Sequence, residues 1–396
     1  DAGESLVLSR ASSTVDEVVR CGGWCAGAIN VTTGQRYSME RIKASVSGTD
    51  PLNWKTNDVD IRNGLSINDI PVTATPKSKN SVSYELNALR DITADLTLTL
   101  DESPYYVKDT FVRVVPGATL RIDPGVVIKF RSRAGLRIEG NVIAEGTPSS
   151  PIVFTSLTDD EYGGDLNRDA TSTLPVPGYW YGVEIKSTSA NSVFRDVIFR
   201  YGGSFFHTYQ SILAVNGSSP QISNSVFEYS QESGLNLANS TSTVSTNIFR
   251  DNGENGIFAS GGAPQLIQNQ LLRGRYGLLS QNSAVEATDN YAEGNSLGAF
   301  VQRGRLGSGF YANNNAVQNG VNGVSVSGDL SMAGDQIHLK KNSVPYLLNE
   351  YNDLTIASSS TLVIDPAVVV KTNNKKIRIE GELQIQGREG ERVVVT

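Results

Sequence analysis

A glycine followed by an apolar residue recurs at nearly constant spacing between residues 221 and 326. The pairs begin at Gly234, Gly256, Gly277, Gly298 and Gly323, and subtraction gives steps of 22, 21, 21 and 25 residues. A fixed period of this length is typical of repeat proteins. The apolar runs between the glycines are short, and Gly, Asn and Ser separate them. Short strands fit this pattern better than helices, and about three strands per repeat predict a parallel β-helix.

A polar residue precedes an apolar pair in successive repeats, at Asn224, Thr246, Asn269 and Asp289. Equivalent side chains of neighbouring coils stack, and amides at a turn can hydrogen-bond along the axis. We expect these four residues to form an internal polar ladder with a structural role.

Composition narrows the classes of function. The 396 residues include 38 Gly but only two His, and the formal net charge is −7. Glycine suits many tight turns, whereas two histidines leave little material for histidine-based catalysis. An acidic chain argues against nucleic-acid binding, which needs a clustered basic face. No stretch approaches the ~20 apolar residues of a membrane-spanning helix.

Residues 1–70 differ from the repeats and show short alternating runs between turn-rich spacers, with Trp24 and Trp54 as expected anchors of a small β core. The motifs in this region are Gly3-Glu4-Ser5-Leu6-Val7-Leu8, Val15-Asp16-Glu17-Val18, Trp24, Gln35-Arg36-Tyr37-Ser38-Met39-Glu40-Arg41-Ile42 and Asp50-Pro51-Leu52-Asn53-Trp54. Their order resembles the second half of a lamin tail domain. The resemblance implies a partial immunoglobulin-like β-sandwich, which lacks its first strands and leaves strand edges exposed.

The cysteines are Cys21 and Cys25, separated by Gly-Gly-Trp. This spacing permits a local disulfide, which fits an oxidising, extracellular setting. Two free buried thiols are the main alternative. A zinc site would need two further ligands, and a redox motif is normally one residue shorter.

Residues 71–104 contain prolines and a polar run, followed by an alternating stretch, and they predict a linker and then the N-terminal cap of the β-helix. From Tyr105 onward short strands alternate with Pro-Gly turns, as in Val112 to Gly125 and Val126 to Phe130. This set resembles the opening coils of right-handed parallel β-helices of bacterial surface and secreted proteins. The resemblance implies such a β-helix over residues 105–343.

A longer repeat lies near the C-terminal end of the sequence. Leu362 to Lys371 copy Leu120 to Lys129 at an offset of 242, and Arg378 to Gly381 copy Arg137 to Gly140 at 241. Residues 344–396 are therefore expected to be the start of a second β-helix module or the final coils. With half a domain at the other end, the pattern predicts a piece of a larger protein built from tandem modules.

Residues 156–177 form a less regular, acidic insertion. Asp165, Asn167 and Asp169 place oxygen ligands at alternating positions, as at the start of a calcium loop. The Gly and the distant Glu of an EF-hand are missing, which excludes that motif. Calcium, the one cofactor that the sequence suggests, would pin the insertion. The alternative is a solvated acidic loop that satisfies its backbone through Asp and Asn turns.

The densest aromatic run contains Tyr179, Trp180 and Tyr181, followed by Tyr209. Exposed aromatic faces on the flank of a β-helix would bind glycans by stacking on sugar rings. The alternative is that Trp180 packs under the insertion and a second loop at residues 202–210.

Many parallel β-helices are polysaccharide lyases or hydrolases, which need paired carboxylates or a basic proton acceptor. Their motifs are not found in coils 180–326, and the arginines at 273, 275, 303 and 305, opposite Glu286 and Glu293, fit solvated ion pairs. We predict a non-catalytic structural or adhesive rod, secreted or at the cell surface, whose partners are other copies or modules, or surface glycans. The alternative is a polysaccharide lyase or glycoside hydrolase with its groove near residues 156–210.

Overall fold

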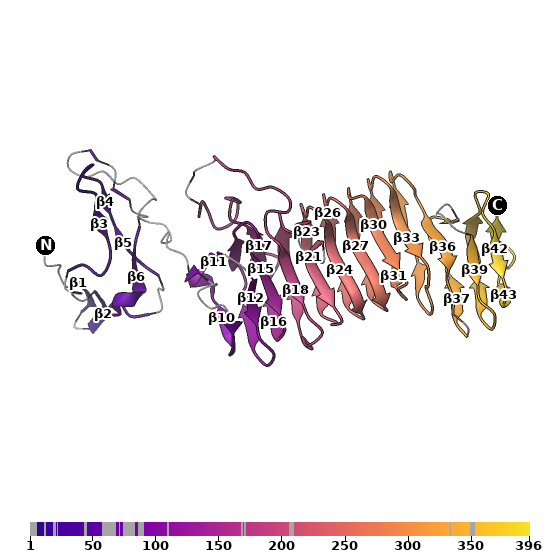
Figure 1. The fold of residues 1–396 in the computed structure, drawn as a ribbon, viewed down its shortest axis with the longest axis horizontal. Coiled ribbons are helices and arrows are strands. Elements are labelled where there is room, and N and C mark those ends of the chain that lie inside the picture. Colours follow the sequence, from indigo (N-terminus) through magenta and orange to yellow (C-terminus); the bar gives the residue numbers. More distant parts are fainter. Residues whose placement is uncertain are drawn as a thin grey trace.

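The structure of the chain is a computed structural model. It describes residues 6–11, 13–18, 21, 23–42, 46–57, 69–70, 72–73, 84–85, 91–108, 111–167, 169, 172–205, 210–332, 334–348 and 353–396. Figure 1 shows a long stack of strands that takes up most of the chain, with a smaller β-rich region beyond the N-terminal end of the stack.

Three parallel sheets form the stack, and the described residues contribute 9, 10 and 15 strands to them. Sheet 1 consists of β10 (Leu96–Leu98), β13 (Thr119–Ile122), β16 (Asn141–Glu145), β19 (Val193–Arg195), β22 (Gln221–Ser223), β25 (Thr243–Ser245), β28 (Gln265–Ile267), β31 (Glu286–Thr288) and β34 (Phe310–Ala312). Sheet 2 consists of β8 (Tyr84–Glu85), β11 (Tyr105–Val107), β14 (Val127–Phe130), β17 (Ile152–Ser156), β20 (Val197–Arg200), β23 (Val226–Glu228), β26 (Ile248–Arg250), β29 (Gln270–Leu272), β32 (Tyr291–Glu293) and β35 (Asn315–Val317).

Sheet 3 contains the longest strands. It consists of β9 (Asp91–Ile92), β12 (Phe111–Val114), β15 (Gly135–Ile138), β18 (Gly182–Ile185), β21 (Ser211–Asn216), β24 (Ser233–Ser240), β27 (Asn255–Gly262), β30 (Tyr276–Gln281), β33 (Gly298–Arg303), β36 (Val324–Asp329), β38 (Tyr346–Leu347), β39 (Leu354–Ile356), β41 (Val369–Lys371), β42 (Ile377–Ile379) and β44 (Val394–Val395). A smaller parallel sheet joins β37 (Gln336–Leu339), β40 (Thr361–Ile364) and β43 (Glu382–Ile385).

Each coil lays its strands beside those of the coil before it, in register. Leu235 of β24 pairs with Ile257 of β27, which pairs with Leu278 of β30, so the sequence period becomes a column of inward apolar side chains. A glycine precedes each of these residues because the backbone of the next coil lies too close for a side chain. A Cβ at residue 277, for example, would lie 2.5 Å from the carbonyl oxygen of Ala299. The prediction of an all-β chain that folds as a parallel β-solenoid is confirmed, with about 12 turns.

Aromatic residues fill part of the interior from coil to coil. Phe154, Phe199, Phe227 and Phe249 are fully buried. Their consecutive ring centroids lie 4.8, 5.0 and 4.7 Å apart, in stacked orientations. This spacing follows the distance between neighbouring strands of a sheet, so one rotamer repeats along the axis.

The internal polar ladder lies one residue after most of the predicted positions. The side-chain amides of Asn247, Asn269, Asn290, Asn314 and Asn342 form a chain in which each Nδ2 donates to the next Oδ1 at 2.9–3.1 Å. Of the four residues predicted for the ladder, only Asn269 belongs to it.

The other three predicted residues occupy the turn just before the ladder. Asn224, Thr246 and Asp289 are exposed and have left-handed φ values of 51°, 56° and 57°. Such a turn favours a small polar residue, and the following residue is the one that points inward. The prediction was therefore wrong for these three residues.

The N-terminal region contains short sheets only, as far as its residues are described. They pair β1 (Leu6–Arg10) with β2 (Ser13–Val18), β5 (Met39–Arg41) with β6 (Trp54–Thr56), and β4 (Arg36–Tyr37) with β3 (Ala28–Ile29) and β7 (Val72–Thr73). A short 3₁₀ turn, Pro51–Asn53, precedes β6. An immunoglobulin-like sandwich, and the lamin tail resemblance behind it, stay predictions.

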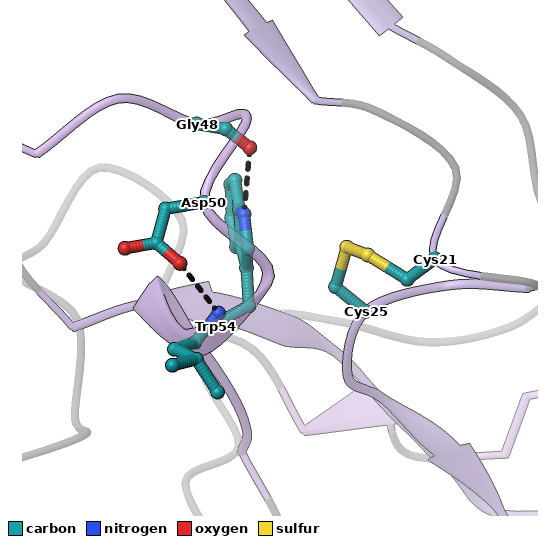
Figure 2. Close-up of a disulfide and its surroundings, with 6 residues drawn as sticks. Cys21, Cys25, Gly48, Asp50 and Trp54 are labelled. Atoms are coloured by element: carbon teal, nitrogen blue, oxygen red, sulfur yellow. Dashed lines mark hydrogen bonds between the residues drawn. A yellow bond between two sulfur atoms is a disulfide. The ribbon is translucent and has the colours of Figure 1, made fainter.

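A disulfide joins Cys21 and Cys25, whose Cα atoms are 5.0 Å apart, and Figure 2 shows it near Trp54. The Nε1 of Trp54 donates to the carbonyl oxygen of Gly48 at 2.9 Å, which anchors this ring. Trp24 is 44% exposed, so its predicted role as a core anchor is wrong. The described part of the chain contains no helix long and apolar enough to cross a membrane.

Parallel pairing already includes β8, β9 and β10, which lie within the segment expected to be a linker and cap. A second 3₁₀ turn, Leu100–Glu102, follows β10.

Near the other end of the stack, β36 pairs with β38 through its first half and with β39 through its second half. The last coils continue the same stack. Leu383, Ile385, Val394 and Val395 are exposed in β43 and β44, whereas their counterparts in β16 and β17 are covered by the next coil.

Candidate functional site

The insertion that follows β17 lies against the shaft and brings several charged groups together (the long loop beside β17 in Figure 1). Lys129, on β14, is fully buried, and its ammonium donates to the carbonyl oxygen of Gly164 in the insertion. Asp159 accepts a hydrogen bond from Thr155 at 2.5 Å, which fixes the start of the insertion on the end of β17. These two contacts fix the local fold, because residues of β14 and β17 bond directly to residues of the insertion.

Three carboxylates of the insertion converge beside Lys129. One oxygen each of Asp160, Asp165 and Asp169 lies within 4.8 Å of the other two. Oδ1 of Asp160, Asn167 and Asp169 is buried without a hydrogen-bond partner. Burial, followed by the negative charge of Asp165, raises the pKa of Asp160. The cluster therefore contains more negative charge and more acceptors than its own hydrogen bonds satisfy.

This geometry fits a calcium ion. Calcium binds six to eight oxygens at about 2.3–2.6 Å, so two ligand oxygens lie at most about 5 Å apart. Asp165, Asn167 and Asp169 were the predicted ligands, and the structure places Asp160 beside two of them. Sequence spacing missed Asp160 because it lies five residues before Asp165, and only the fold of the loop returns it to the cluster.

Among the described residues, Lys129 brings a positive charge to this cluster. Burial lowers the pKa of Lys129 to about 8, although the charges of Asp159, Asp160 and Asp165 act in the opposite direction. Asp159 also pairs with Arg200, whereas Asp160, Asp165 and Asp169 lie together and repel one another, so a further cation would relieve that repulsion.

A second buried cation anchors the other side of the insertion. Arg200 of β20 forms ion pairs with Glu161 at 2.7 Å, Glu228 at 3.2 Å and Asp159 at 3.5 Å. Burial disfavours its charge, but these carboxylates outweigh burial and raise the pKa of Arg200. Tyr rings surround the guanidinium, with centroids 4.8–5.8 Å away, at positions 162, 201 and 229. The insertion is thus tied to two coils of the shaft.

The predicted glycan-binding aromatics do not form one exposed surface. Trp180 is fully buried, stacks on Phe130 at 4.1 Å and donates from Nε1 to a backbone oxygen at 2.9 Å, so it cannot contact a sugar. Tyr181 stacks on Phe111 at 5.6 Å, and Tyr179 is partly buried against the core. Tyr209 lies outside the described residues. The burial of Trp180 contradicts its place among the glycan-binding candidates and agrees with the alternative of a packed ring.

Two of the four predicted arginines pair with acids one coil earlier, whereas Arg305 pairs with Asp335 at 3.3 Å and Arg303 donates to the hydroxyl of Tyr276 at 3.3 Å. Arg273 contacts Asp251 through two hydrogen bonds of 2.7 Å, and Arg275 contacts Glu254 at 2.9 Å. Glu293, an expected partner, instead accepts from Tyr291 at 2.9 Å. These pairs are solvated rungs of the kind expected, with different partners, and each contributes little to stability.

A comparison with known protein families supports the β-helix. Residues 181–344 match the family model described as "Right handed beta helix region". A Drosophila melanogaster protein, "Protein bark beetle", is 39% identical over 113 residues, which are 28% of this chain and 4% of that protein. The chain thus spans a small fraction of the length of this relative.

A solved alginate lyase from Paenibacillus sp. str. FPU-7 aligns with 69% of this chain and 99% of its own, at 12% identity and a TM-score of 0.29. A likeness this weak carries no argument about activity.

Proposed function

We propose that this chain is a non-catalytic, rod-like β-helix segment of a longer extracellular protein, with a structural or adhesive role. The observation that carries the proposal is the use of charged groups at the insertion. Lys129 is fully buried on a backbone oxygen, and Arg200 is buried among three carboxylates. A lyase would need such charged groups at its surface, whereas here they hold the insertion on the shaft.

The regular shaft supports the same role. Its interior is closed by apolar columns and by the asparagine ladder, so each coil stabilises the next. Such a rod can separate or connect other modules, and we propose other copies or modules, or surface glycans, as its partners. The match to a small part of a much longer animal protein supports a segment role.

An extracellular location belongs to the proposal. The Cys21–Cys25 disulfide is compatible with it, because disulfides persist in oxidising compartments and are rare in the cytosol. The bacterial origin expected from the sequence also stays a prediction.

We further propose that calcium occupies the cluster of Asp160, Asp165, Asn167 and Asp169 and holds the insertion on the shaft. The ion would neutralise like charges and satisfy the three orphaned oxygens. Calcium should therefore slow proteolysis within residues 156–177. The Asp160→Asn variant should lose this protection, whereas Asp289→Asn, on an exposed turn, should keep it. Equal protection of both variants would show that the cluster binds no calcium.

A polysaccharide lyase or glycoside hydrolase is the competing function. We would incubate the purified chain, with and without calcium, with a panel of neutral and acidic polysaccharides and measure new reducing and unsaturated ends. The rod proposal expects none. Turnover that disappears in Asp165→Asn, but persists in Asp289→Asn, would overturn it.

A further inference from the structure

A cavity of about 520 Å³ opens on the outer face of sheet 3, apart from the insertion cluster. Its floor is built from neighbouring coils, where Asn236 of β24, Phe258 of β27 and Leu279 of β30 form one outward column in register. Phe205 contributes an exposed aromatic edge. The size falls in the range of small-ligand sites, about 300–1,000 Å³.

Two carboxylates line this cavity on adjacent coils. The backbone N–H of Glu254 donates to the carbonyl oxygen of Glu232 at 3.2 Å, so the two residues occupy consecutive rungs. Glu254 is already paired with Arg275, at 2.9 and 3.1 Å. In the described part of the chain, no cation acts on the carboxyl of Glu232. Burial, followed by the charge of Glu254, raises the pKa of Glu232. Among the described residues, the half-buried carboxylate of Glu232 thus lies beside a second carboxylate and has no counterion.

A third acceptor lies beside the carboxylates. Asn255 is 7% exposed and lines the cavity. Its Nδ2 donates to Oγ of Ser233 at 2.9 Å, while its Oδ1 is buried without a hydrogen-bond partner. Leaving a buried acceptor unpaired is unfavourable, so a ligand that brings hydrogen-bond donors gains from this site.

We propose that this cavity binds an arginine side chain of a partner protein. The Glu232 carboxylate offers the charge-assisted pairing that a guanidinium favours, and Asn255 offers a further acceptor. The aliphatic stem would lie on Leu279, and the planar guanidinium can stack on the ring of Phe258. A cationic ligand matches the acidic lining, whereas an anionic one is repelled. The inference does not depend on the rod-like role, because it rests on this cavity alone.

The test uses the whole chain and two small probes, N-acetyl-arginine amide and its neutral citrulline counterpart, with binding measured by ligand-observed NMR. The arginine probe should bind and the citrulline probe should not. Glu232→Gln should weaken binding roughly 10- to 100-fold, since the variant loses a charge-assisted hydrogen bond. Glu286→Gln, on β31 of sheet 1, is the matched control and should leave binding unchanged.

Three results would overturn the proposal. They are equal binding of the two probes, an unchanged affinity for the arginine probe in Glu232→Gln, and binding of a neutral oligosaccharide in place of the arginine probe. The last result would identify the cavity as a sugar site. Circular dichroism of each variant shows whether the solenoid is intact. Glu232→Lys is a second variant, and it should abolish binding because its ammonium would fill the site.

Discussion

Replacing Asn269 with alanine tests whether the asparagine ladder holds the coils together. This side chain is fully buried and makes four hydrogen bonds to other coils. Its Nδ2 donates to the carbonyl oxygen of Val244 at 2.9 Å and to Asn290 at 3.0 Å, and its Oδ1 accepts from the backbone N–H and the Nδ2 of Asn247, both at 3.1 Å.

The structure gives the size of the effect. In Asn269→Ala, Nδ2 of Asn247 keeps the carbonyl of Ile222, and Oδ1 of Asn290 keeps the backbone N–H of residue 269. The backbone N–H of Asn247 loses its partner inside the solenoid, whereas Val244 stays in the parallel ladder of β25 and β28. An orphaned buried donor costs about 1–3 kcal/mol, so we predict a loss of that size.

Urea unfolding followed by circular dichroism measures this loss, provided that the slope of the transition stays the same. Gln270→Ala is the matched control, because this amide is the next residue and exposed, and its loss should stay within about 0.5 kcal/mol. If Asn269→Ala and Gln270→Ala unfold at the same urea concentration, the ladder does not stabilise the shaft and the reasoning is refuted.

Three further predictions concern other parts of the molecule. Phe249→Ala removes a ring stacked at 4.7 Å on Phe227 and should cost about 3–5 kcal/mol in the same urea assay; a cost below that of Gln270→Ala would contradict a close-packed core. The pKa of Lys129 falls from 10.5 to about 8 on folding, so the unfolded chain binds more protons between these values and stability should rise with pH there. Lys129→Met should flatten that rise, and an unchanged slope would refute the assignment. Cys21 and Cys25 should resist alkylation until a reductant is added, which mass spectrometry detects as two added groups; alkylation without reductant would contradict the disulfide.

The repeat itself determined the solenoid. Gly234, Gly256 and Gly277 recur because a Cβ would meet the backbone of the next coil, and the apolar residues that follow them point inward because the strands stack in register. Local spacing contains this information, so the fold class, the period and the position of the insertion were visible in the sequence. The acidic character of residues 156–177 was visible for the same reason.

Only the tertiary structure decided which polar side chains act together. The ladder begins at Asn247 and not at Thr246, because a one-residue shift moves a side chain from the core to the solvent. Trp180 is buried because its ring stacks on Phe130, a contact that only the fold creates. Asp160 joins Asp169, and Glu232 lies beside Glu254, through loop folding and coil stacking, which connect residues that no short motif contains. A sequence pattern states which residues repeat, whereas burial and partners depend on the direction in which each side chain leaves the coil.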